Sequence, residues 1–175
     1  MNIEEIKGPF ILDSNVFIEA HRRYYGLDLC PGFWTALKHH FENGNLFSLD
    51  RVKQELEGED NLWEWIKDNL PGEFFHSTGS PQVTEAFSEL MVWVNSEPQY
   101  VPAARAEFAS VADGWLPAYS IDQGGTVVTH EELAPAAKKR IPLPNVCEKF
   151  DVPYIDTFEM LRFLETEFHW DAPNS

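Results

Sequence analysis

Phe10-Ile11-Leu12-Asp13-Ser14-Asn15-Val16-Phe17-Ile18 passes from a short apolar run, through three polar residues, into a segment with helical patterning. An apolar run that meets a carboxylate and then becomes helical is typical of the first strand and helix of a doubly wound α/β fold. Ligands of such folds bind outside the carboxyl ends of the strands. Asp13 is therefore predicted to point into that crevice.

The rest of the chain continues this alternation of strand and helix patterns. The predicted strands are residues 9–12, 45–49, 73–76, 125–129 and 153–155. Helical patterns cover residues 61–70 and 157–164, and Ser80-Pro81 is a typical cap and first turn of a further helix. We therefore predict an α/β fold with a parallel sheet of about five strands and helices on both faces.

Length and composition fit one domain. The chain has 175 residues, of which 43% are hydrophobic, enough to bury a core. We expect one domain over residues 1–170 and a disordered tail over residues 171–175. No apolar stretch approaches the roughly 20 residues that span a bilayer, and the first five residues are too acidic for a signal peptide. The sequence thus predicts a cytoplasmic protein without membrane contact, in which Cys30 and Cys147 stay reduced.

Acidic residues stand where several apolar segments end or turn. They are Asp13, Glu55, Asp113 and Glu131, and their wide spacing means that only a tertiary fold can bring them together. Such oxygen ligands suit Mg2+ or Mn2+. Each acid also has a simpler explanation. Asp13 and Asp113 are good helix caps, and Glu55 could be an exposed helical charge. Glu131 could be a loop charge beside Glu132, so the choice between Glu131 and Glu132 as the ligand stays open.

These acidic segments resemble the motifs of the PIN-domain nucleases, in particular the toxin ribonucleases of bacterial toxin-antitoxin pairs. The matching segments, in family order, are Leu12-Asp13-Ser14-Asn15, Val52-Lys53-Gln54-Glu55-Leu56, Ala112-Asp113-Gly114-Trp115-Leu116 and Val127-Val128-Thr129-His130-Glu131. The chain is similar in particular to a branch of single-domain PIN-like proteins of unassigned function that carry V-V-T-H-E. Two positions depart from the family pattern. Glu131 stands where many members have Asp, and Pro117 falls in the helix after the third acid, where a first-turn proline is tolerated.

The resemblance implies a metal-dependent endoribonuclease that hydrolyses RNA phosphodiester bonds with Mg2+ or Mn2+. It further implies a toxin that forms a homodimer and is neutralised by an antitoxin protein. Asp13, Glu55, Asp113 and Glu131 would be its catalytic residues and metal ligands, with Asp13, Asp113 and Glu131 within metal-bridging reach and Glu55 facing them from a helix. Supporting roles are expected for Asn15, Thr129 and Asp156, although Asp156 is also suited to cap the last helix.

The net charge of -16 opposes binding of a polyanion such as RNA. Bound divalent ions would offset part of this charge at the site. The candidates for the remaining phosphate contacts are Arg22, Arg23, Arg51, Lys53, Lys138, Lys139 and Arg140, each of which could equally be an ordinary surface charge. The acidic surface would also suit a basic segment of a protein partner.

Two other functions remain open at this stage. One is a catalytically silent PIN-like module that only binds a partner. The other is a haloacid dehalogenase-like phosphatase, which requires a second aspartate two positions after the first, where this chain has Asn15. A zinc site of the H-E-x-x-H type is excluded, because Ala134 stands at the second histidine position.

Overall fold

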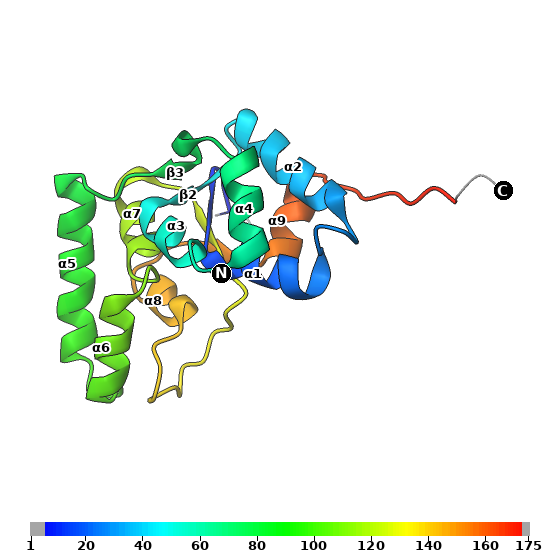
Figure 1. Cartoon of the computed structure of the whole chain (residues 1–175). Helices are drawn as coiled ribbons and strands as arrows, with labels where there is room; N and C mark the ends of the chain where they lie inside the picture. Colours follow the sequence, from blue (N-terminus) through cyan, green and yellow to red (C-terminus); the bar gives the residue numbers. More distant parts are fainter. Residues whose placement is uncertain (1–5, 173–175) are drawn as a thin grey trace.

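A five-stranded sheet lies at the centre of the computed structural model, which describes residues 6–172 (Figure 1). The strand order is β3-β2-β1-β4-β5, and every neighbouring pair is parallel. The strands are β1 (Phe10–Leu12), β2 (Leu46–Leu49), β3 (Phe75–His76), β4 (Thr126–Val128) and β5 (Tyr154–Ile155). Each one lies within a strand predicted from the sequence, so the predicted α/β fold with a parallel sheet is confirmed.

Helices cover both sides of the sheet. They are α1 (Ser14–Glu19), α2 (Pro31–Glu42), α3 (Asp50–Leu56), α4 (Asp60–Asn69), α5 (Pro81–Ser96), α6 (Pro102–Ser110), α7 (Trp115–Gln123), α8 (Leu143–Lys149) and α9 (Thr157–Phe163), with a π-helical turn η2 (Ala20–Tyr24) and a 3-10 turn η3 (Gly72–Phe74). In Figure 1, α2, α4 and α9 lie to the right of the strands, whereas α5, α6 and α7 lie to the left.

The predicted helix boundaries agree with the structure to within one residue. Ser80 caps α5 by accepting a hydrogen bond from the backbone N-H of Val83 at 3.2 Å, as the Ser80-Pro81 pair predicts. Pro117 is the third residue of α7, in the first turn, where its missing N-H costs little. Of the predicted tail, residues 173–175 lie outside the described part of the chain, and residues 171–172 have no regular structure.

The central strands are buried on both faces. All residues of β1, β2 and β4 are buried, which is why these segments are almost wholly apolar. Leu12 of β1 pairs with Val128 of β4, and the N-H of Asp13 donates to the carbonyl of Val128 at 3.0 Å. This register places Asp13 and Thr129 side by side at the carboxyl edge of the sheet.

Two further findings concern the cysteines and the lengths of the helices. Cys30 and Cys147 are both free. Within residues 6–172, no helix has the length and apolar content needed to cross a membrane.

The turn before β4 requires glycine. Gly124 and Gly125 have φ values of 77° and 103°, and a Cβ at Gly125 would lie 2.7 Å from the carbonyl oxygen of Pro9. We expect Gly125→Ala to lower the free energy of unfolding by about 1–3 kcal/mol, because alanine is strained at this φ and also meets the backbone before β1. Urea unfolding followed by circular dichroism measures the loss.

Gly58 provides the matched control, because it lies in an exposed turn without a positive φ and an added Cβ would meet nothing within 4 Å. Gly58→Ala is expected to change the free energy of unfolding by less than about 0.5 kcal/mol. Equal losses in the two variants would contradict the conformational explanation for Gly125.

Candidate active site

Asp13 lies at the end of β1 and has two structural partners. It is the N-cap of α1, and its Oδ1 accepts a hydrogen bond from the Ser14 backbone N-H at 2.6 Å. Its Oδ2 accepts a hydrogen bond from the Thr129 hydroxyl at 2.9 Å. With 2% of its surface exposed, Asp13 is a buried carboxylate that caps a helix and faces the end of β4.

Asn15 and Thr129 connect the ends of β1 and β4. The Asn15 side-chain amide donates to the Thr129 hydroxyl oxygen at 2.9 Å, and its carbonyl oxygen accepts from the His130 backbone N-H at 3.0 Å. The Glu131 backbone N-H also donates to the Thr129 hydroxyl oxygen, at 3.2 Å. These bonds orient both Asp13 and the backbone that carries Glu131.

Glu55 comes from α3, and Asp113 comes from the turn between α6 and α7. Glu55, on α3, accepts a hydrogen bond at its Oε1 from the backbone N-H of Ala112 at 2.8 Å. This bond attaches the turn that carries Asp113 to α3. Asp113 is not the N-cap of α7, because that position is Gly114. The capping explanation therefore does not account for Asp113.

Glu131 is held by the start of α8. Its Oε2 accepts from the Leu143 backbone N-H at 2.9 Å, and its charge acts on both Asp13 and Asp113. Glu132 is exposed and lines the same recess as Glu131, but it is not among the charges that act on Asp13 and Asp113. The structure thus brings Glu131, and not its neighbour, together with the other acids.

Burial and repulsion between carboxylates raise the pKa values of Asp13 and Asp113. Burial raises the pKa of Asp13 to about 7, with the Thr129 hydrogen bond lowering it and the charges of Glu131 and Glu55 raising it further. Burial likewise raises the pKa of Asp113 to about 8, with additional repulsion from Asp13, Glu131 and Glu55. The neighbouring charges that act on both groups are carboxylates. A bound cation would favour the ionised forms of all four acids.

The donors suit a hard divalent cation, because all are carboxylate oxygens. Within residues 6–172, however, no three His, Cys, Asp or Glu side chains converge closely enough to hold one ion between them. The expectation that Asp13, Asp113 and Glu131 lie within metal-bridging reach is therefore not met in this structure. Mg2+ typically keeps several waters and uses only one or two protein carboxylates directly, so the donor set fits a hydrated ion.

The raised pKa values make stability depend on pH. Because the folded protein holds the protons of Asp13 and Asp113 more tightly than the unfolded chain, their contribution to stability is complete below pH about 4 and is lost as the pH rises through about 7–8. We expect Asp113→Asn, compared with wild type in EDTA, to lose less melting temperature between about pH 5 and pH 8. Thermal unfolding across this range measures the difference. Identical pH profiles for the two proteins would contradict the raised pKa of Asp113.

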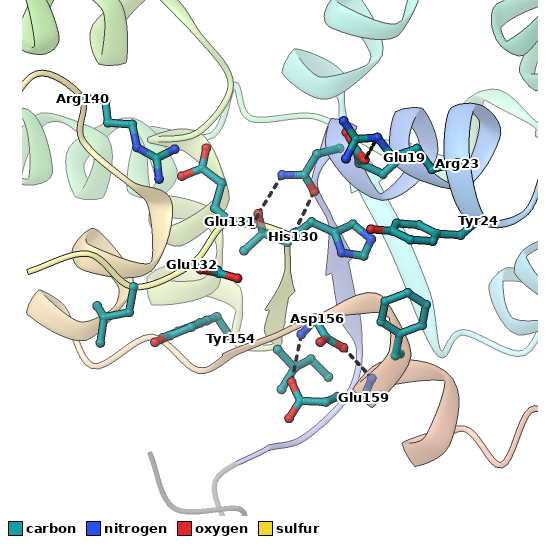
Figure 2. A pocket seen from close by; sticks show the side chains of 15 residues that line it. Glu19, Arg23, Tyr24, His130, Glu131, Glu132, Arg140, Tyr154, Asp156 and Glu159 are labelled. Carbon is teal, nitrogen blue, oxygen red and sulfur yellow. Dashed lines mark hydrogen bonds and ion pairs between the residues drawn. The ribbon is translucent and has the colours of Figure 1, made fainter. Parts of the chain in front are cut away.

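A recess of about 740 Å³ opens beside Glu131 (Figure 2). The part of its wall next to the carboxylate cluster consists of Asn15, Thr129 and Glu131. Tyr24 from η2 and Phe158 from α9 also line it. Asp156 also lines this recess, but it acts as the N-cap of α9 in a capping box with Glu159, which confirms the capping role expected for it.

His130 forms another part of the recess wall. Its Nε2 lies 2.9 Å from the Thr157 hydroxyl. Burial lowers the pKa of His130, although Asp156 and Glu19 act in the opposite direction. The ring is thus favoured in its neutral form.

Three of the seven candidate basic residues line a pocket beside the acidic residues. Arg23 and Arg140 line the recess, and in Figure 2 the Arg140 side chain points toward Glu131. Arg51 lines a second pocket of about 300 Å³ together with Glu55, and its guanidinium lies 4.7 Å from the centre of the Trp115 ring. The remaining candidates have other surroundings: Arg22 pairs with Glu59 at 2.7 Å, Lys53 lies 6.0 Å from the Phe75 ring, and Lys138 and Lys139 are exposed in the segment before α8.

Sequence patterns did not single out Tyr24 and Phe158. Phe158 follows β5 by only a few residues, so its place after a strand end could have identified it as a residue near the site. Tyr24 ends the π-helical turn η2 and has no such signal in its sequence surroundings. Only the packing of η2 against α9 brings the two rings together.

The fold and this edge define an α/β protein with a cluster of four carboxylates at the carboxyl ends of a parallel sheet. Residues 10–168 match the family model for a domain of unknown function, DUF4411, and the chain belongs to this family. Comparison with curated proteins and with solved structures found no match.

Proposed function

We propose that this chain is a metal-dependent endoribonuclease of the PIN type. The observation that carries the proposal is the gathering of Asp13, Glu55, Asp113 and Glu131 from four separate segments. Asp13 is buried and Asp113 is half-buried, and their pKa values are raised to about 7 and about 8. Such a concentration of repelling carboxylates in a crevice is more often found at a functional site than in a structural core. The resemblance of the four motifs to those of PIN-domain nucleases supports RNA as the substrate.

Asp13 and Asp113, the two acids with raised pKa values, would hold a Mg2+ or Mn2+ ion, with Glu131 and Glu55 completing the acidic surroundings. Bound there, a divalent ion supplies an activated water and charge stabilisation for the leaving oxygen of a phosphodiester. Thr129 and Asn15 hold Asp13 and the Glu131 backbone in position through the bonds described above. Glu55 keeps the turn of Asp113 in place through the Ala112 N-H.

The net charge of -16 requires local compensation for an RNA substrate. Arg140 points toward Glu131 in the recess, and Arg51 lines the second pocket together with Glu55. Both are suited to phosphate oxygens, because a guanidinium presents a planar fork of donors. Arg23 is less available, since it pairs with Glu19 at 3.1 Å.

Incubation of the purified protein with single-stranded RNA tests this proposal. Fragments are expected with Mn2+ or Mg2+ and not with EDTA, and Asp113→Asn purified in parallel controls for contaminating ribonucleases. If neither metal supports cleavage and neither raises the melting temperature, the second candidate is favoured. That candidate is a catalytically silent partner-binding module, and it is supported by the lack of a closed metal cage among the described residues.

The resemblance also supports a biological role as a homodimeric toxin neutralised by an antitoxin, and the acidic surface would suit a basic antitoxin segment. Expression in bacteria is expected to arrest growth, and Asp113→Asn is expected to relieve the arrest at equal protein level. Equal growth arrest by both proteins would contradict a toxin role based on this site.

A further inference from the structure

We propose that the recess beside Glu131 is a nucleobase subsite that prefers guanine, a specificity that rests on the ribonuclease function proposed above. Its volume of about 740 Å³ lies within the range of about 300–1,000 Å³ that is usual for small-ligand sites. Because Glu131 belongs both to the recess and to the carboxylate cluster, a base bound here would bring its own phosphodiester to the acidic edge.

Aromatic side chains from η2, from α9 and from the segment after β4 line the recess. The Tyr24 ring centre lies 5.8 Å from that of His130 and 5.3 Å from that of Phe158, and the His130 and Phe158 centres are 5.6 Å apart. Figure 2 shows the Tyr24 ring next to His130. Tyr24 is 44% exposed, so its ring is accessible to a ligand. Aromatic side chains stack on the π faces of bases, and one such contact changes affinity about 5- to 150-fold.

The polar groups of the recess favour an uncharged ligand that donates hydrogen bonds. Acidic side chains outnumber basic ones, because Glu19, Glu131, Glu132, Asp156 and Glu159 face only Arg23 and Arg140. Away from Arg140, this excess disfavours a phosphate within the recess and leaves the base as the part of a nucleotide that fits.

Most of these acids already have partners. Glu19 pairs with Arg23, Asp156 and Glu159 cap each other's backbone N-H groups, and Glu131 accepts from Leu143. Glu132 has no hydrogen bond or ion pair with residues 6–172, and its carboxylate is exposed at the recess. Glu132 is therefore the acceptor most available to a ligand.

Guanine is the base that best matches a free carboxylate. Its N1-H and N2-H groups point the same way and can donate to both oxygens of Glu132, as the N-H groups of an arginine fork do. Adenine and cytosine offer one amino group at the corresponding edge, and uracil offers one N-H flanked by two carbonyls that a carboxylate repels. The recess should therefore rank guanine first and uracil last.

Nucleoside binding in EDTA tests the subsite apart from catalysis. Guanosine and uridine carry no phosphate, so neither bound metal nor the negative charge of the protein affects their binding. NMR chemical shifts can follow the titration. We expect guanosine to bind about tenfold more tightly than uridine, the scale of one bidentate base contact. Glu132→Gln should remove this preference while leaving uridine binding unchanged. Tyr24→Ala should weaken both nucleosides about tenfold, and Tyr24→Phe should restore them because the stacking ring remains.

Trp170→Ala is the matched control, since Trp170 is 80% exposed and lines a different pocket. It should leave both affinities unchanged. Equal affinity for guanosine and uridine, the absence of saturable binding, or an equal effect of Trp170→Ala and Tyr24→Ala would overturn the subsite.

The two proposals can fail separately. Guanosine binding that survives in a protein unable to cleave RNA would support the subsite and contradict the nuclease. Cleavage of RNA without any preference for guanine at the cut would contradict the subsite alone. Asp113→Asn should bind guanosine as wild type does, because Asp113 does not line the recess.

Discussion

Asp113→Asn is expected to abolish Mn2+-dependent RNA cleavage while leaving the metal-free protein at least as stable as wild type. Burial and three neighbouring carboxylates raise the pKa of Asp113 to about 8, so its ionised form is repelled in the folded state. An uncharged amide relieves this repulsion, and the same change weakens the attraction for a cation. Cleavage assays together with thermal unfolding, with and without Mn2+, measure both effects.

Asp13→Asn should abolish cleavage as well, with a smaller gain in stability. The two oxygens of Asp13 accept hydrogen bonds from the Ser14 N-H and the Thr129 hydroxyl, and an asparagine keeps only one of these acceptors. Asparagine remains a good N-cap, so α1 should persist. Mn2+ should raise the melting temperature of wild type more than that of either variant.

Asp68→Asn is the control for both substitutions, because it removes an exposed carboxylate from α4. It should leave cleavage and metal stabilisation unchanged. If Mn2+ raised the melting temperature of wild type, Asp13→Asn and Asp113→Asn equally, and cleavage were unchanged, the proposed site would be wrong.

Thr129→Val is expected to lower the free energy of unfolding by about 3 kcal/mol and to abolish cleavage. The buried Thr129 hydroxyl donates to Asp13 and accepts from the Asn15 amide and the Glu131 N-H. Valine has nearly the same shape but no hydroxyl, and each buried polar group left without a partner costs about 1–3 kcal/mol. Loss of its hydroxyl partner also further raises the pKa of Asp13, because this bond favours the ionised form. Urea unfolding and RNA cleavage measure the two consequences.

Thr129→Ser separates the role of the hydroxyl from that of side-chain volume. Serine keeps the hydroxyl and loses one methyl group, so cleavage should survive with a loss of about 1 kcal/mol. Equal behaviour of the serine and valine variants would show that the hydroxyl does not organise the site.

Local patterns in the sequence were sufficient to predict the sheet and several helix ends. The parallel strands are buried on both faces, so they are short, almost wholly apolar runs that stand out from the helical periodicity around them. Ser80 before Pro81 and Asp156 before α9 are caps whose side chains bond within three residues, so their signals are contained in the adjacent sequence. The four acids could be chosen because their surroundings resemble known motifs.

The spatial relations among those acids depended on the tertiary structure. The β1–β4 register places Asp13 against Thr129 across 116 positions of the sequence, and the Glu55 bond to Ala112 spans 57. The folded chain also decided between Glu131 and Glu132 as the member of the acidic cluster. It further showed that the carboxylates are arranged openly and that Tyr24 packs on Phe158. By itself, the sequence determined which segments become strands and helices and where acids stand at their ends, because burial and capping act over a few residues. Only the tertiary structure decided which of these groups meet, because side-chain contacts between distant segments are set by strand register and helix packing, which leave no trace in local periodicity.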